Sequence, residues 1–150
     1  MKQNNKTSWI IQGLLVLLII LLVGFQVWEI QEVPFHPDES TQLFMSSDFD
    51  LLFSRPVEMT WESTKEADPR QRYRVLDAPL TRYLLGLALS LAGEDNLPTD
   101  WNWSLDWEAN RQAGALPSSE LLRAGRLGIT LLLPLSMLFL LLSARKIGGI

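Results

Sequence analysis

The stretch that decides the fold is "WIIQGLLVLLIILLVGFQVW", residues 9–28, which carries no formal charge. A second uncharged run, "LGITLLLPLSMLFLLLSA", covers residues 127–144. At about 1.5 Å per residue, helices of these lengths reach roughly 27–30 Å, which is close to the thickness of the hydrocarbon core of a bilayer. Because a helix satisfies its own backbone hydrogen bonds in lipid, the sequence predicts an all-α membrane protein with two transmembrane helices that flank an external loop.

The charges around the two runs predict the orientation of the chain. Both short ends are basic and contain no acidic residue, with their charges at Lys2, Lys6, Arg145 and Lys146. Residues 29–126 hold all 17 acidic residues and the remaining basic ones. Since basic flanks stay on the cytoplasmic side, we expect an integral protein of the cell (inner) membrane with residues 1–8 and 145–150 cytoplasmic and the loop outside.

Two short juxtamembrane helices are expected in the loop. Pro37 suits the first turn of a helix over about residues 37–53. Pro79 opens a second helix over about residues 79–92, and Gly93 can close it. The apolar part of this second helix is too short to span a bilayer, so we expect it to be buried or to lie on the membrane surface.

The rest of the loop looks irregular. Residues 54–75 are polar and interrupted by proline, and residues 94–119 show no clear periodicity. Ser118 or Ser119 can cap a last helix, which Pro134 is expected to kink inside the second span. The chain contains no cysteine, which excludes disulfides and metal sites built on thiolates.

The adjacent acids Asp38 and Glu39 lie shortly after the first span and allow two interpretations. Acidic residues in the first turn of a helix stabilise its dipole and its free N–H groups. Alternatively, a carboxylate at a membrane surface can act as a general base, and an acidic pair can bind a divalent cation. His36 is the only histidine, and a single histidine is more often a structural hydrogen-bonding group than a catalyst.

Other polar residues give weaker signals. Asp48 and Asp50 form a D-x-D triplet of a kind that can bind a metal and phosphate, but on a helix the two acids would diverge. Asp77 precedes the helix that Pro79 opens. Arg82 can pair with an acid or a phosphate, or extend along an apolar helix toward water.

Three tryptophans, at positions 101, 103 and 107, alternate with acidic residues in "DWNWSLDWE". Tryptophan beside a bilayer is usually an interfacial anchor, and aromatic rings with acids can also form a sugar-binding face. Asn102 begins an N-x-S triplet, which is an acceptor sequence for N-glycosylation.

The order of these motifs resembles the N-terminal part of membrane glycosyltransferases with the GT-C fold. The most similar group is the dolichyl-phosphate-mannose–protein mannosyltransferase type and its bacterial relatives, including the lipid A aminoarabinose transferases. Such enzymes carry an acidic pair soon after the first span, which corresponds to Asp38 and Glu39 in "HPDES". The element "DAPLTRYLLG" is similar to a second family motif, with Asp77, Pro79 and Leu80 at matching positions, although Ala78 replaces the first of two prolines.

The resemblance implies transfer of a sugar from a polyprenyl-phosphate donor to a protein, glycan or lipid acceptor on the outer face, with inversion at the anomeric carbon. The candidate catalytic residues are then Asp38 and Glu39, with Asp38 as general base and Glu39 in a supporting role. The candidate substrate-binding residues are His36, Asp77 and Arg82. A divalent cation, Mg²⁺ or Mn²⁺, is a possible cofactor at the acidic pair.

Enzymes of this type have many membrane spans. The resemblance therefore implies that these 150 residues are the N-terminal portion of a longer enzyme. The alternative from another class is a small two-span membrane subunit or scaffold without catalysis, in which the acidic pair only starts a helix. A third hypothesis is a membrane-anchored glycan-binding domain that uses the tryptophans. The lipid bilayer is a partner in every case, and no interaction with nucleic acid is expected.

Overall fold

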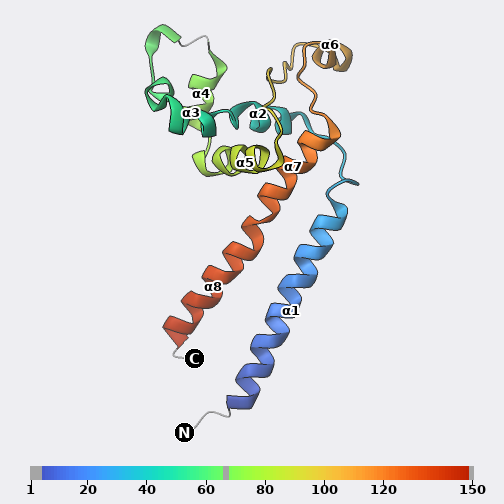
Figure 1. Ribbon diagram of the computed structural model, residues 1–150, viewed down its shortest axis with the longest axis vertical. Helices are drawn as coiled ribbons and strands as arrows, with labels where there is room; N and C mark the ends of the chain where they lie inside the picture. Colours follow the sequence, from blue (N-terminus) through green and yellow to red (C-terminus); the bar gives the residue numbers. More distant parts are fainter. Residues whose placement is uncertain (1–4, 66–67, 149–150) are drawn as a thin grey trace. The chain divides into compact units, whose positions relative to one another are not determined.

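The computed structural model describes residues 5–65 and 68–148, and all regular secondary structure in these ranges is helical (Figure 1). Two stretches are long and apolar enough to cross a membrane, Trp9–Glu29 and Ser119–Ile147. The prediction of an all-α membrane protein with two candidate spans is therefore confirmed. The chain divides into two compact units, the span unit (residues 1–33 and 130–150) and the loop unit (residues 34–129).

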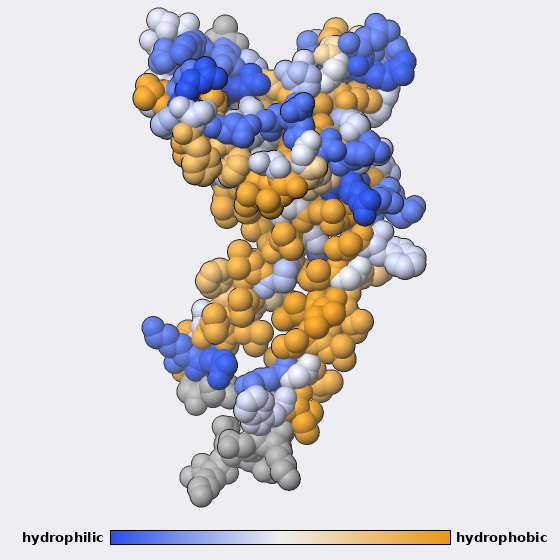
Figure 2. Space-filling model, in the orientation of Figure 1, coloured by the Kyte–Doolittle hydropathy of each residue, from blue (hydrophilic) through white to orange (hydrophobic). Residues whose placement is uncertain are grey.

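The span unit contains α1 (Asn5–Glu29) and α8 (Leu132–Gly148). Apolar side chains of both helices, among them Leu18 and Leu141, line a shared pocket. Most of the other apolar side chains of these helices are exposed, and they form the orange surfaces of α1 and α8 in Figure 2. An apolar surface of this extent is suited to lipid rather than water.

The loop unit contains six α-helices and two 3₁₀ turns within its described residues. The helices are α2 (Pro37–Met45), α3 (Asp48–Ser54), α4 (Pro69–Leu76), α5 (Pro79–Ala92), α6 (Trp107–Gln112) and α7 (Ser119–Thr130). The turns are η1 (Pro56–Met59) and η2 (Ser63–Lys65).

The single helix expected over residues 37–53 is wrong, because the chain forms α2 and α3 with a break at two serines. The Ser46 hydroxyl donates to the Leu43 carbonyl at 2.6 Å, and the Ser47 hydroxyl donates to the Phe44 carbonyl at 3.0 Å. These carbonyls would accept the next N–H groups of a continuous helix. Serine side chains thus compete with the backbone ladder and separate the two helices.

Two short helices lie where the sequence looked irregular. Asp68 caps α4 by accepting from the Arg70 N–H at 2.9 Å, with Pro69 as the first helical residue. Asp106 caps α6 in the same way, accepting from the Ala109 N–H at 2.8 Å. The expectation of irregular structure over 54–75 and 94–119 is therefore wrong for these segments, whose helices begin at side-chain caps rather than at an apolar pattern.

The predictions for α5 and α7 are confirmed. Helix α5 begins at Pro79 and ends at Ala92, and Gly93 follows it in the left-handed conformation with φ 73°. The Ser118 hydroxyl accepts from the Leu121 N–H at 3.1 Å and caps α7. Helix α7 ends at Thr130, four residues before Pro134, whose missing N–H cannot continue the ladder.

The core of the loop unit lies between α2, α5 and α7. Its buried residues are Leu43, Phe44, Met45, Leu85, Leu89, Leu97, Leu121 and Ala124. Two glycines allow close approach of helices, because neither leaves room for a side chain. A Cβ atom added to Gly86 would lie 2.2 Å from the Cβ of Phe49 in α3. A Cβ atom added to Gly128 would lie 2.5 Å from the Cβ of Ala88 in α5. Helix α5 is therefore held against both α3 and α7 at van der Waals distance.

Candidate functional site

The acidic pair lies in the first turn of α2, where a reciprocal cap fixes the chain. The His36 Nδ1 accepts from the Asp38 N–H at 3.2 Å, and the His36 N–H donates to Glu39 Oε2 at 2.9 Å. This capping box satisfies two N–H groups that the helix itself leaves free. Because Nδ1 accepts a hydrogen bond here, the neutral ring carries its proton on Nε2. His36 therefore has a structural role at this position.

Glu39 is engaged in an ion pair with Arg126 of α7. Arg126 Nε donates to Oε1 at 2.7 Å and Nη2 donates to Oε2 at 2.8 Å, while Nη2 also donates to the Pro34 carbonyl at 3.1 Å. Partial burial raises the pKa of Glu39, but the hydrogen bonds from Arg126 and His36 outweigh burial and place this pKa below its usual value of 4.5. Glu39 is thus held as a carboxylate that joins α2 to α7.

Asp38 differs from its neighbour in exposure and in contacts. Its side chain is 74% exposed, and its Oδ2 lies 3.4 Å from Nδ1 of His36. The carboxylate is therefore open to solvent while its backbone is fixed by the cap. Of the two acids, Asp38 has the more exposed carboxylate.

The acidic pair does not fit a divalent-cation site. Both carboxylate oxygens of Glu39 are occupied by Arg126, so Asp38 alone would remain as a ligand. Over residues 5–65 and 68–148, no group of three or more histidine or acidic side chains is arranged to hold a metal ion. Calcium and magnesium sites usually combine several oxygen ligands, so the acidic pair by itself offers too few.

Arg82 takes part in a buried charge cluster with Asp48 and Arg74. Asp48 is fully buried and accepts from Arg74 Nε at 3.2 and 3.0 Å and from Nη2 at 2.6 Å. Arg82 Nε lies 3.4 Å from Asp48 Oδ2, and neither its Nε nor its Nη1 has a hydrogen-bond partner in the described structure. The cluster connects α3, α4 and α5 and contains one more positive than negative charge.

Asp77 and Asp50 complete the acidic candidates. Asp77 directly follows α4, where its N–H donates to the Tyr73 carbonyl at 2.8 Å, and among the described residues its carboxylate has no hydrogen bond or ion pair. Asp50 accepts from Asn96 at 3.1 Å, whereas Asp48 points into the charge cluster. The two acids of the D-x-D triplet therefore diverge, as expected for a helix.

A third polar group joins α2 to α4 through Asp100. Its carboxylate accepts from the Thr41 hydroxyl and from the Tyr73 hydroxyl, each at 2.7 Å. Burial and this hydrogen bond raise the pKa of Tyr73 to about 12. Tyr73 therefore stays neutral at physiological pH and serves as a fixed hydrogen-bond donor.

The tryptophans form a cluster with Phe35, immediately before the cap of α2. Trp101 is buried, and its ring centroid lies 5.3 Å from that of Trp107, 6.2 Å from Phe35 and 6.4 Å from Trp103. Trp103 and Trp107 keep much of their surface exposed. The sequence did not predict that this aromatic surface would adjoin the segment that carries Asp38.

Three contacts of the site could not be found from the sequence. They are the ion pair of Glu39 with Arg126, the ion pair of Asp48 with Arg74, and the packing of Phe35 against the tryptophans. Glu39 and Arg126 are 87 residues apart, and no local pattern links them. In comparisons with protein-family models, with curated proteins and with solved structures, no match to this chain was found.

Proposed function

We propose that this chain is the N-terminal portion of a membrane glycosyltransferase that moves a sugar from a polyprenyl-phosphate donor to an acceptor on the outer membrane face. The observation that supports the proposal best is the exposed Asp38 carboxylate, fixed at the start of α2 by a cap and followed by an acid that is committed to Arg126. A rigid backbone with one accessible carboxylate is what a general base needs.

In this mechanism Asp38 takes the proton from an acceptor hydroxyl. The hydroxyl oxygen then forms a bond to the anomeric carbon as the bond between that carbon and the donor phosphate oxygen breaks. The polyprenyl phosphate leaves with the electron pair, and the anomeric configuration inverts because attack and departure occur on opposite faces. The proton transfer to Asp38 is written without a metal ion at the acidic pair, because Glu39 is engaged by Arg126.

The remaining candidate residues take different roles in the proposal. Glu39 and His36 position Asp38, because they form the cap and the link to α7. Arg82 is buried beside Asp48 of α3, with its side chain only 7% exposed, and is therefore not open to a substrate phosphate. Asp77, whose carboxylate has no side-chain partner in the described residues, is the donor-side candidate.

A non-catalytic two-span subunit is the second candidate function. It is favoured by the number of acids that have structural partners, since Glu39, Asp48 and Asp100 each join two helices or segments of the loop unit. In this case Asp38 would contribute only to the N-terminal charge of α2.

Photo-cross-linking in native membranes distinguishes the two candidates. A polyprenyl phosphate with a photoreactive group near its phosphate is added to membranes that contain the protein, and a polyprenol without the phosphate is the matched control. The glycosyltransferase proposal expects saturable labelling of the loop unit that a synthetic polyprenyl-phosphate sugar displaces. Equal, non-saturable labelling by both probes, confined to α1 and α8, would reject it in favour of the subunit.

A further inference from the structure

One ring nitrogen of His36 faces two groups of Asp38 that make opposite demands on it. Nδ1 accepts a hydrogen bond from the Asp38 N–H at 3.2 Å, and the same atom lies 3.4 Å from Asp38 Oδ2. The first contact needs a lone pair on Nδ1, as in the neutral ring. The second is favourable only when Nδ1 carries a proton. The protonation state of His36 therefore decides which part of Asp38 it holds.

Protonation of His36 removes the cap of α2. Both nitrogens of an imidazolium are donors, so no rotation of the ring gives the Asp38 N–H an acceptor. The carboxylate of Asp38 can then accept from Nδ1–H. A charge-assisted hydrogen bond has a length of about 2.8 Å, so the two atoms have to approach by only roughly 0.6 Å. Both side chains can move this far, because they are 65% and 74% exposed.

The other carboxylate of this turn does not compete for the protonated ring. Glu39 accepts from the His36 backbone N–H at 2.9 Å, and both of its oxygens accept from Arg126 of α7. Because Arg126 engages Glu39, Asp38 is the carboxylate that the imidazolium can bind. Since the acidic pair does not fit a divalent cation, only a proton changes place when His36 is titrated.

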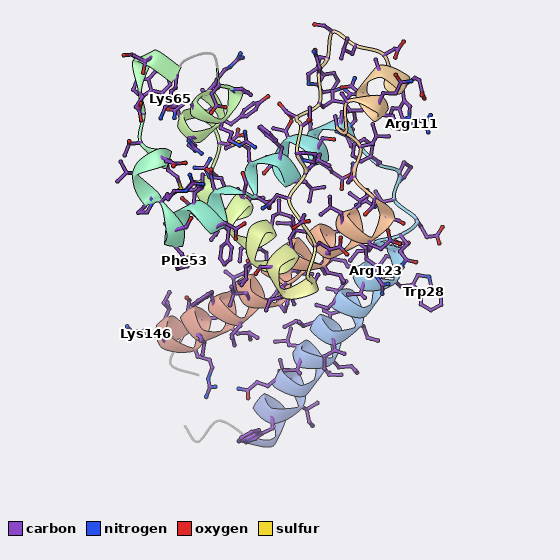
Figure 3. All side chains as sticks on the ribbon, turned by 45° about the horizontal axis from the view of Figure 1, so that its top comes forward. Trp28, Phe53, Lys65, Arg111, Arg123 and Lys146 are labelled. Carbon is purple, nitrogen blue, oxygen red and sulfur yellow. The ribbon has the colours of Figure 1, made fainter. Side chains whose placement is uncertain are left out.

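The charged groups of α6, which adjoins this segment, have partners of their own. The ring centroid of Phe35 lies 5.8 Å from that of Trp107, the first residue of α6. Asp106 caps α6, and Glu108 forms an ion pair with Arg111, which lies at the outer edge of α6 in Figure 3. The contact with α6 therefore brings no further titratable partner to the ring.

We propose that His36 is a proton-operated switch for Asp38. In the neutral state Nδ1 caps α2, and the Asp38 carboxylate is free. When Nδ1 takes a proton from solvent, it releases the Asp38 N–H and binds the carboxylate. Histidine changes its charge between about pH 5 and 8, so the switch operates on the acid side of neutrality.

The consequence for catalysis rests on the proposed function, in which Asp38 is the general base. A cation beside a carboxylate favours its ionised form and so makes it a weaker proton acceptor. His36 is then a positioning residue that frees Asp38 near neutral pH and engages it in acid. The change in hydrogen bonding itself does not depend on which reaction Asp38 performs.

Nuclear magnetic resonance tests the switch directly, because the chain contains a single histidine and its ring signals are unambiguous. The protein is labelled with ¹⁵N and ¹³C in aspartate and reconstituted in lipid nanodiscs, and the Asp38 signals are assigned by their loss in D38N. The matched variant is H36N, since asparagine is a good N-cap that does not titrate. Asp106, an exposed N-cap of α6, is the internal control.

We expect the Asp38 amide and carboxyl signals to shift between about pH 8 and 5 with the same midpoint as the His36 ring. Neither signal of Asp106 should follow that midpoint, and H36N should abolish both shifts at Asp38. Asp38 signals that stay fixed while the ring titrates, or that still move in H36N, would overturn the proposal. A shift of the amide alone would also overturn it, because the carboxylate would then not be bound.

The pH dependence of sugar transfer separates the switch from the proposed function. With a synthetic polyprenyl-phosphate sugar, the wild-type rate should fall several-fold from about pH 7.5 to 5.5, whereas H36N should keep its own rate over this range. An equal fall in both proteins would remove His36 from the control of Asp38. Absence of transfer from both proteins, with the Asp38 shifts present, would reject the glycosyltransferase and retain the change in hydrogen bonding.

Discussion

The buried charge cluster of Asp48, Arg74 and Arg82 supports a sharp prediction about stability. Asp48 is fully buried, and Arg74 donates three hydrogen bonds to it at 2.6 to 3.2 Å. Arg82 lies 3.4 Å away and makes no hydrogen bond through Nε or Nη1. The two arginines therefore contribute unequally, although both are adjacent to the same carboxylate.

The substitution D48N removes the only negative charge from this cluster and leaves two buried guanidinium groups without a counter-charge. Breaking a buried ion pair on one side costs about 3–5 kcal/mol. The substitution R82M removes a poorly paired buried charge and keeps most of the side-chain volume, so we expect a change within about 1 kcal/mol in either direction. The expected difference in stability between D48N and R82M follows from which hydrogen bonds each side chain makes, and not from its charge alone.

Urea unfolding in lipid nanodiscs measures this difference. The buried Trp101 reports on the loop unit, and the spans remain in lipid. With a denaturant slope of about 2 kcal/mol per molar, D48N is expected to lower the midpoint by about 2 M, and R82M by about 0.5 M or less. Equal midpoint shifts for the two variants, or a larger shift for R82M, would refute the reasoning.

Three further predictions concern the contacts around the site. E39Q should cost about 1 kcal/mol at pH 7, and because Arg126 lowers the folded pKa of Glu39, the difference in stability from wild type should shrink as pH falls below 4.5; a difference that stays constant as pH is lowered would contradict this. G128A should destabilise the loop unit by about 1–3 kcal/mol because its Cβ would meet Ala88, whereas G24A, which has open space, should leave the urea midpoint unchanged. Y73F should cost about 1 kcal/mol at neutral pH and remove a loss of wild-type stability that begins above pH 10 and follows the ionisation of Tyr73 up to about pH 12; identical alkaline curves would contradict the hydrogen bond to Asp100.

The sequence predicted those parts of the fold that local rules determine. Length and composition were enough to predict a helix over the uncharged run at residues 9–28. Pro79 at the start and Gly93 at the end were enough to predict α5. Prediction failed where polar side chains decide the structure. The hydroxyls of Ser46 and Ser47 end one helix, which an apolar pattern cannot show.

The candidate site was only partly predictable for the same reason. Asp38 and Glu39 are adjacent in the sequence, so the pair was evident and Asp38 was the expected base, but the sequence did not show that Glu39 forms an ion pair with Arg126 in α7. Likewise, Arg82 was expected to meet an acid or a phosphate, and its neighbour Asp48 comes from a different helix. Such partners are set by packing between distant segments, which a single sequence does not encode locally.

Sugar transfer by the protein carrying D38N, with D95N as the matched exposed-acid control, tests the proposed function most directly. Membranes containing each variant at equal amounts receive a synthetic polyprenyl-phosphate sugar, and the transferred sugar is counted. If Asp38 is the general base, D38N should lose roughly 10²- to 10⁴-fold of the transfer rate while D95N stays at the wild-type rate. Transfer by D38N at the wild-type rate, or no transfer by the wild-type protein, would contradict the account.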